Sequence, residues 1–332
     1  MPDWGDILKE INEERARSGN LTYDRIRRKY LVLLSQNTGR TTVLYASKWT
    51  QSNPNIPPEL ISVTIEDVQG FMEVMHGIDS QKLDLLIHSP GGSLEAAEAI
   101  VTYLRSKFTH IRAIIPHAAM SAATIIACAA DEIIMGKHSF LGPIDPQIIL
   151  HTPLGPRAVP AQAILDQFER AKHECSDPQK LAAWVPMLNQ YGPDLLVNCK
   201  NALDLSEELV RKWLTNYMFA NESDRVQKAD RLAKWLSNHS NFKTHGRFLD
   251  RGKLRAEGLN PKNLEEDQDL QDLVLSVFHA TTQTFDGTGA LKIIENNLGK
   301  CFVKLLQVQG VPFGSIPILQ PMAPPATPSP DR

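Results

Sequence analysis

The feature that most constrains the fold is a repeated junction, at which a short apolar segment leads directly into a helix. Residues 84–88, DLLIH, continue through S-P-G-G into a helical pattern over 93–107. The same arrangement recurs where residues 111–116, IRAIIP, precede a helix of small residues expected over 121–130. Strands of four to six apolar residues alternating with helices are typical of a parallel sheet that is buried on both faces. We therefore predict an α/β fold with a parallel sheet.

Around these units the chain is predicted to be mainly helical. Strands are expected over 40–49 and 132–135, and a Pro-rich loop follows the first of them. Further helices are expected over residues 5–35 (as one helix or two), 62–75, 161–172, 178–188, 205–219, 229–239 and 270–285. We divide the chain into an N-terminal helical arm (1–40), a main domain (41–310) with a helical insertion at about 155–230, and a Pro-rich tail (311–332) predicted to be disordered.

Composition excludes several classes of function. The chain has 332 residues and a formal net charge of −3, so its overall charge does not favour nucleic acid or an anionic membrane as a partner. The cysteines lack CxxC spacing, and no HExxH or HxxxH pattern occurs, so we predict no metal and no cofactor. The four cysteines are Cys128, Cys175, Cys199 and Cys301. Their scatter suggests no disulfide framework and fits a reducing cytoplasm.

The N-terminal region does not resemble a targeting segment. It is charged from the start and lacks the apolar stretch of a signal peptide, and no run reaches the ~18 apolar residues of a membrane span. We therefore expect a cytoplasmic protein. Residues 25–34, RIRRKYLVLL, are basic and apolar enough to touch a membrane surface, but packing against the core or a neighbouring subunit is the favoured interpretation.

Each junction has a structural explanation and a functional one. Gly91 and Gly92 permit positive φ and close approach to the backbone, and their N–H groups suit a developing negative charge. On the dipeptide alone, a tight turn is the favoured interpretation. Ser121 stands at the start of a helix, where a serine is most often an N-cap. That role does not explain why its neighbours Ala118, Ala119, Ala122 and Ala123 are all small.

The two junctions together are more specific than either alone. Gly92 and Ser121 are 29 residues apart, with one helix and one strand between them. This spacing places both at the carboxyl ends of adjacent parallel strands, where α/β sheets hold their ligands. The arrangement is that of acyl transfer: the Ser121 hydroxyl attacks a carbonyl, and the N–H groups of Gly92 and Ala122 hold the oxyanion. Gly91 belongs to the same substrate-binding loop.

At these residues the sequence resembles the Clp protease/crotonase superfamily, and within it the signal peptide peptidase A class and the related serine dehydrogenase proteinase family. The matching stretches are LLIHSPGGSLEAA, IPHAAMSAATIIACAADEIIM, HSFLGPIDPQ and, more weakly, THGRFLDRGKLRAEGL. The resemblance implies a Clp/crotonase-like ββα superhelix with a parallel sheet, a helical insertion and C-terminal helices. It also implies ATP-independent hydrolysis of peptide or unfolded protein substrates by a homo-oligomer. Ser121 is then the nucleophile.

The general base is less well defined by the sequence. Where Clp proteases place their histidine, this chain has LGPIDPQ, whereas peptidase A types use a lysine. Lys172, 51 residues after Ser121, is the lysine at a similar separation, and His117 is an alternative base. Asp145 either orients a base or caps a turn. His138 and His151 are interpreted as loop residues, and His245 as structural or near an interface.

Two other functions stay open at this point. A crotonase-like enzyme acting on an acyl thioester would use the same backbone N–H groups but would leave the setting of Ser121 unexplained. A non-catalytic oligomeric scaffold of the same fold would explain the missing histidine.

Overall fold

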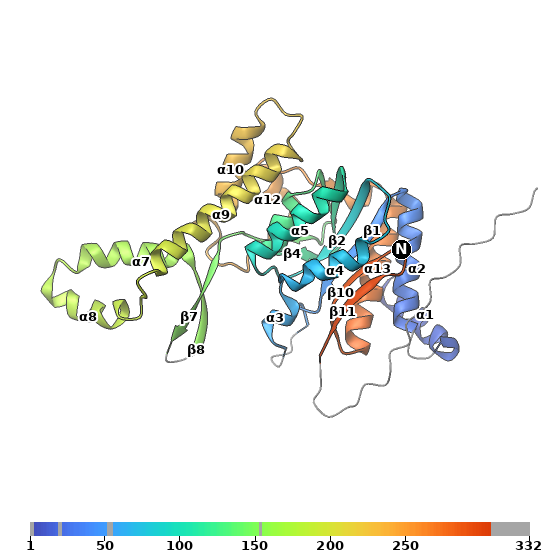
Figure 1. Cartoon of the computed structure of the whole chain (residues 1–332), viewed down its shortest axis with the longest axis horizontal. Helices are drawn as coiled ribbons and strands as arrows, with labels where there is room; N and C mark the ends of the chain where they lie inside the picture. Colours follow the sequence, from blue (N-terminus) through green and yellow to red (C-terminus); the bar gives the residue numbers. More distant parts are fainter. Residues whose placement is uncertain (1–2, 19–21, 52–55, 153–154, 307–332) are drawn as a thin grey trace, which may run out of the picture.

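A seven-stranded sheet forms the centre of the molecule (Figure 1). The computed structural model describes residues 3–18, 22–51, 56–152 and 155–306. In spatial order the strands are β11 (Cys301–Leu305), β10 (Ala290–Asn296), β1 (Thr41–Ser47), β2 (Lys82–His88), β3 (His110–Ile115), β5 (Glu132–Met135) and β9 (Lys262–Asn263). The five strands from β1 to β9 are parallel, whereas β10 is antiparallel to both of its neighbours. The predicted α/β fold with a mostly parallel sheet is confirmed.

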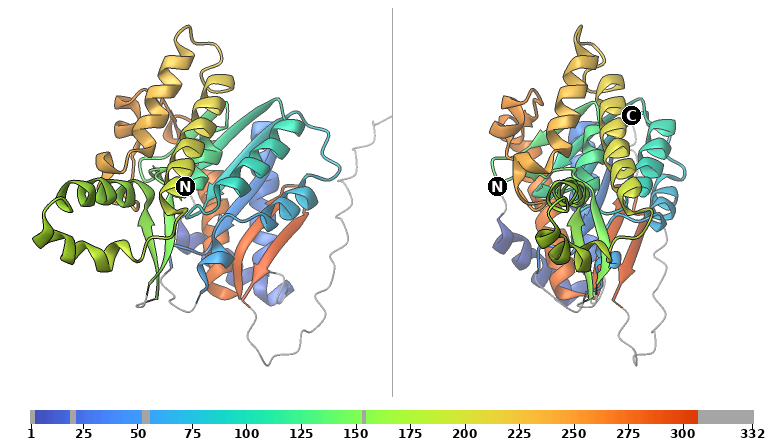
Figure 2. Two further views of the ribbon diagram at one scale, coloured as in Figure 1. Left: turned by 60° about the vertical axis from the view of Figure 1, so that its left-hand side comes forward. Right: turned by 90° about the vertical axis from the view of Figure 1, so that its left-hand side faces the viewer.

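Helices cover both faces of this sheet because successive side chains of each strand point to opposite sides. In β2, Leu85 and Ile87 lie in one hydrophobic cluster, while Leu86 lies in the other. The first cluster contains α4 (Glu66–Met75), α5 (Leu94–Lys107), α6 (Ala122–Cys128), the second half of α9 (Leu195–Asn216) and α10 (Arg225–Ser237). The second contains α1 (Trp4–Ser18), α2 (Thr22–Thr38) and α13 (Gln268–Gly287) (Figure 2).

Three of the parallel strands, β2, β3 and β5, are each followed by a second short strand or bridge before the next helix. β3 leads into β4 (Ala118–Ala119) and then α6, and β5 leads into β6 (Phe140–Leu141), which pairs with β4 in parallel. After β2, Ser89 makes an isolated parallel bridge to Ala119. This strand–strand–helix succession is the expected ββα arrangement, and it gathers the ends of β2 and β3 at one edge of the sheet.

A protruding arm departs from the main body between β6 and the second half of α9 (Figures 1 and 2). It consists of the hairpin β7 (Gln147–Thr152) and β8 (Gly155–Pro160), the helices α7 (Ala161–Glu174) and α8 (Pro178–Leu188), and the first half of α9. Its apolar residues form a third, smaller cluster centred on Ile164, Leu195 and Cys199. The helical insertion predicted at about 155–230 therefore includes both this arm and helices that pack against the sheet.

The remaining elements are short. They are α3 (Pro58–Ile61), α11 (His239–Phe242), α12 (Arg251–Ala256) and a 3-10 turn (Leu264–Glu266). In the described part of the chain, no helix combines the length and the apolarity that a bilayer span requires. In α2, Ile26, Leu31 and Leu34 are buried with α13, so this segment packs against the core. The Pro-rich tail predicted over 311–332 lies outside the described residues.

Among the strands that the sequence did not predict are β10 and β11 of the central sheet. β10 has the sequence ALKIIEN, in which Lys292 and Glu295 suggest a solvent-facing segment. Both charged side chains are nevertheless fully buried, because Lys292 pairs with Asp67 and Glu295 pairs with Arg27 and Arg28. Pairing between distant segments lets these charges enter the core.

Candidate active site

The two strand–helix junctions lie side by side at the carboxyl edge of β2 and β3. The Ser89 N–H donates to the Ala118 carbonyl at 3.1 Å, and the Met120 N–H donates to the Ser89 carbonyl at 3.0 Å. These two bonds hold the loop after β2 against the turn before α6. Gly91, Gly92, Ser121 and Ala122 are thereby brought into one place, although 29 residues separate Gly92 from Ser121 along the chain.

Close approach explains why the first junction carries two glycines. A Cβ on Gly91 would lie 2.6 Å from the Ser121 Cβ and 2.8 Å from the Ala122 nitrogen, and φ at Gly91 is +90°. A Cβ on Gly92 would lie 2.4 Å from the Val63 carbonyl oxygen. Val63 is hydrogen-bonded to this loop through the Gly91 carbonyl at 2.7 Å and the Ser93 N–H at 3.0 Å. No side chain fits at either glycine, so both backbones contact their neighbours directly.

Ser121 has a backbone conformation that its side chain disfavours. Its φ is 52° and its ψ is −122°, and it is one of two non-glycine residues with positive φ in the described chain. Such a conformation costs about 1–3 kcal/mol and persists only where the surroundings impose it. Ser121 precedes α6, yet its hydroxyl makes no capping hydrogen bond. Ser93, at the start of α5, accepts from the Ala96 N–H at 3.0 Å and is an ordinary N-cap.

Two backbone N–H groups of the joined loops have no acceptor in the described part of the chain. Among the described residues, neither the Gly92 N–H nor the Ala122 N–H donates to another part of the chain. Ser121 is half-buried and Gly92 is exposed, so the site is open to solvent. A serine hydroxyl held in a strained turn can attack a carbonyl carbon. Unengaged backbone N–H groups can then donate to the oxygen of that carbonyl.

His117 lies on the opposite side of the sheet from α6, against α13. Its ring stacks on His88 with centroids 5.4 Å apart and lies 5.8 Å from the Phe278 ring. Burial, with the nearby His138, lowers the pKa of His117, and burial lowers the pKa of His88 to about 3. No hydrogen bond joins His117 to Ser121 in the described structure. Its role as an alternative base stays a prediction.

Lys172 lies on the arm. Its Nζ is 2.9 Å from a carboxylate oxygen of Glu169, one turn earlier on α7, and more than half of its side chain is exposed. Helix α7 packs mainly against α9, with fewer contacts to β8 and α8. The structure therefore does not bring Lys172 to the Ser121 of the same chain, and its role as the base also stays a prediction.

A cluster of polar side chains surrounds Asp145, for which the sequence allowed either the orientation of a base or the capping of a turn. Its carboxylate is 1% exposed, and the Nδ1 atoms of His239 and His245 each lie 2.8 Å from one of its oxygens. The Gln147 amide donates to the same carboxylate at 3.1 Å. The two histidines are 94 and 100 residues away from Asp145 in the chain. The segment around His245 resembles a segment of the peptidase families, and this was the available sequence signal for the cluster. No spacing in the sequence, however, relates His245 to Asp145.

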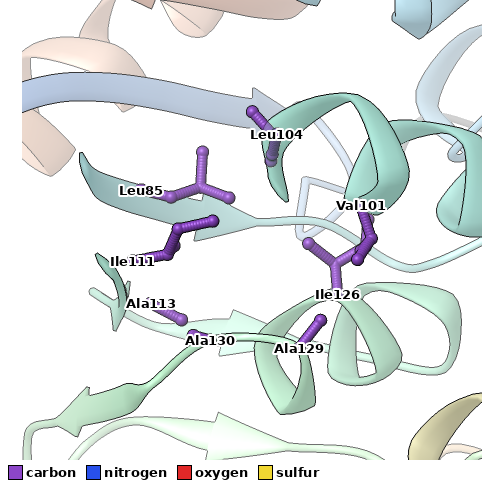
Figure 3. A pocket seen from close by; sticks show the side chains of 8 residues that line it. All are labelled: Leu85, Val101, Leu104, Ile111, Ala113, Ile126, Ala129 and Ala130. Carbon is purple, nitrogen blue, oxygen red and sulfur yellow. The ribbon is translucent and has the colours of Figure 1, made fainter. Parts of the chain in front are cut away.

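The cavities do not define a better site. One lies between α5, α6 and strands β2 and β3, measures about 10 Å³ and is lined by apolar side chains that include Leu85, Val101 and Ile126 (Figure 3). A void of this size and lining is a packing gap. A larger hollow of about 640 Å³ lies between α7, α9 and α10 and is lined mainly by polar residues. Among the described residues no group of three or more His, Cys, Asp or Glu side chains could hold a metal ion.

Comparison with known proteins finds similar sequences and one family model. Two uncharacterized proteins of Methanocaldococcus jannaschii are similar to this chain. One is 33% identical over 198 residues, which cover 59% of this chain and 58% of its own length. The other is 38% identical over 120 residues, which cover 36% of this chain and 39% of its own length. The chain therefore spans less than two thirds of either relative.

Among solved structures, the ClpP protease catalytic domain from Plasmodium falciparum aligns with 12% identity and a TM-score of 0.31, over 61% of this chain and 81% of that one. A similarity at this level does not by itself establish a common fold. The family comparison is more direct, because residues 57–187 match the model of a ClpP-like SDH-type serine proteinase. Residues 57–187, which carry both junctions and Ser121, are thus similar to the ClpP-like SDH-type serine proteinase family.

Proposed function

We propose that this protein is a serine peptidase that hydrolyses peptide bonds through Ser121, without ATP. The observation that carries the proposal is the state of Ser121: φ is 52°, and the hydroxyl does not cap the helix that it precedes. A serine held in a strained turn and withdrawn from structural hydrogen bonds is available as a nucleophile. The match of residues 57–187 to a serine proteinase family model supports the same chemistry.

The proposed oxyanion hole consists of the N–H groups of Gly92 and Ala122. When the Ser121 hydroxyl adds to a peptide carbonyl, negative charge develops on the carbonyl oxygen, and two fixed N–H donors stabilise it. Gly91 contacts both Ser121 and Ala122, so its missing side chain is what allows the two loops to meet. Losing one such donor costs about 10²–10³-fold in turnover in enzymes that have been tested.

The other parts of the proposal concern the setting of the site. We expect a peptide or unfolded protein as the substrate, a homo-oligomer as the active form and the cytoplasm as the location. Lys172, if it serves as the base, must act on the Ser121 of a second copy, because it lies on the arm of its own chain. Light scattering of the purified chain measures the number of copies directly.

Covalent labelling with a fluorophosphonate, mapped by peptide mass, tests the nucleophile. We expect the adduct on Ser121 and none on Ser93, which provides an internal comparison because it also precedes a helix but caps it. Ser121→Ala is expected to abolish labelling and to lower hydrolysis of an unfolded protein such as casein by on the order of 10⁶-fold. The melting temperature of the variant shows that the fold survives. Hydrolysis by Ser121→Ala at the wild-type rate would refute the proposal.

A further inference from the structure

The Asp145 cluster has the arrangement of a carboxylate that orients a general base. Each histidine approaches the carboxylate through Nδ1, and a carboxylate oxygen accepts, so Nδ1 is the protonated nitrogen in each ring. The Nε2 atom of each neutral ring then carries a lone pair. Nothing in the described chain hydrogen-bonds to Nε2 of His245. A buried carboxylate that fixes the tautomer and orientation of a histidine is the support that a serine nucleophile requires.

Backbone pairing places this cluster at the same sheet edge as Ser121. β4 and β6 run in parallel, with Ala119 opposite Leu141. Just beyond them, a Cβ on Gly142 would lie 3.1 Å from the Met120 Cα. The chain after β4 leads to Ser121, and the chain after β6 leads to Asp145. Both therefore leave the paired strands in the same direction.

A second pairing brings His245 to this edge. Leu141 and Leu249 exchange two backbone hydrogen bonds of 3.0 and 2.9 Å in an antiparallel bridge. Because the segments are antiparallel, the chain from 249 back to 245 runs beside the chain from 141 to 145. The contact between Asp145 and His245 is the last link of this pairing. Ser121, Asp145 and His245 thus all lie beyond the ends of the two short strands.

The two histidines differ in what surrounds them. His239 begins α11, and its neighbours Asn238 and Ser240 line the hollow between α7, α9 and α10. His245 belongs instead to the segment that pairs with β6, although the exposed fractions of the two side chains are similar, 21% for His239 and 27% for His245. This difference assigns the catalytic role to His245 and a positioning role to His239.

We propose that His245, oriented by Asp145, is the general base for Ser121; the inference rests on the proposed peptidase function. His245 Nε2 takes the hydroxyl proton as Ser121 Oγ forms its bond to the peptide carbonyl carbon and the carbonyl π electrons move to oxygen. The C–N bond then breaks, and Nε2 gives the proton to the leaving amine. Water adds to the acyl-serine while Nε2 takes its proton, and that proton returns to Oγ as the acid leaves.

The test measures fluorophosphonate labelling of Ser121 and casein cleavage in the full chain. We expect His245→Ala to lower both rates by about 10²–10⁴-fold and added imidazole to restore part of the loss. His239→Ala should give a smaller loss that imidazole does not restore. His151→Ala, which removes an exposed histidine from β7, is the matched control and should keep the wild-type rates. His245→Gln provides a second variant if His245→Ala melts before the assay temperature.

The outcomes separate this inference from the proposed function. Labelling of Ser121 at the wild-type rate in folded His245→Ala or His245→Gln would overturn the assignment of the base and leave the peptidase standing. Equal losses in His245→Ala, His239→Ala and Asp145→Asn, with no response to imidazole, would give the cluster a structural role and also overturn it. Casein cleavage that persists in Ser121→Ala would instead remove the proposed function itself.

Discussion

The central sheet and the arm use charged residues in opposite ways. Between strand β10 and the helices that cover it, Arg27 and Glu295 are fully buried against each other, and so are Lys292 and Asp67. On the arm, the ion pairs of α7 lie at the surface, where the Arg170 side chain is 71% exposed. The apolar residues differ in the same way, because α8 leaves Leu181, Val185 and Met187 exposed.

This difference indicates where the chain tolerates substitution of a charged residue. A buried pair cannot lose one member without leaving an uncompensated charge in a low-dielectric interior. A surface pair gains little, because water and salt screen it and both side chains lose rotamer freedom. The junctions that carry Ser121 are built on the sheet, so the rigid part of the molecule holds the proposed nucleophile.

The largest effect should come from breaking a buried pair. Glu295→Ala removes the carboxylate that faces Arg27 and Arg28, and we expect it to lower the free energy of unfolding by about 3–5 kcal/mol. Urea denaturation followed by circular dichroism measures the change. The double variant Arg27→Met with Glu295→Leu should recover much of the loss, because no charge is then left unpaired. A loss below about 1 kcal/mol for Glu295→Ala would place this pair with the surface pairs of the arm.

Lowering the pH is expected to reduce the unfolding free energy by an intermediate amount. Burial lowers the pKa of His88 to about 3, while an unfolded histidine titrates near 6.5. Above about pH 7 the imidazole is neutral in both states. As the pH falls, the unfolded chain binds a proton that the folded chain does not. The linkage predicts a loss of about 2 kcal/mol in unfolding free energy between pH 7 and pH 5.

His88→Gln should flatten that pH dependence, whatever its effect on stability at pH 7. His173→Gln on the exposed side of the arm is the matched control and should keep the wild-type slope. Unfolding free energies at pH 7 and pH 5 provide the comparison. An unchanged slope in His88→Gln would show that other groups account for the acid sensitivity of the core.

The smallest effect is expected on the arm itself. Arg170→Ala removes an exposed pair with Glu174, one turn later on α7, and should change the unfolding free energy by only about 0.2–0.5 kcal/mol. Raising the salt concentration should reduce even that difference. A change above about 2 kcal/mol would show that the arm depends on its surface charges in a way that the central sheet does not.

Much of the fold could be predicted from local patterns. The alternation around β2, β3 and β5 indicated the parallel sheet, and α7 and α8 begin at the residues where helices were expected. β10 was missed because its charged residues resemble those of a surface segment, and only their partners on α2 and α4 make burial possible. The hairpin of β7 and β8 was missed as well, since its residues pack mainly within the arm.

Some residues of the candidate site could also be predicted from the sequence, and others could not. Gly92 and Ser121 could be paired in advance, because the carboxyl ends of adjacent parallel strands must meet at one edge. Sequence could not relate Asp145 to His245, which are 100 residues apart and meet through a single antiparallel bridge. Lys172 was predicted as the general base from its separation from Ser121 along the chain. That separation carries no information on the position of α7, which belongs to a protruding arm.

Local backbone preferences and the period of apolar residues were enough to predict the strand–turn–helix junctions, and the glycines and small residues around Ser121 can be seen in the sequence directly. Only the three-dimensional structure shows that the Ser121 hydroxyl leaves its helix uncapped, that Lys172 lies on a protruding arm, and that two histidines share one buried carboxylate. Such contacts join segments that are distant in the chain, and the free energy that holds them comes from the packing of the whole sheet and its helices.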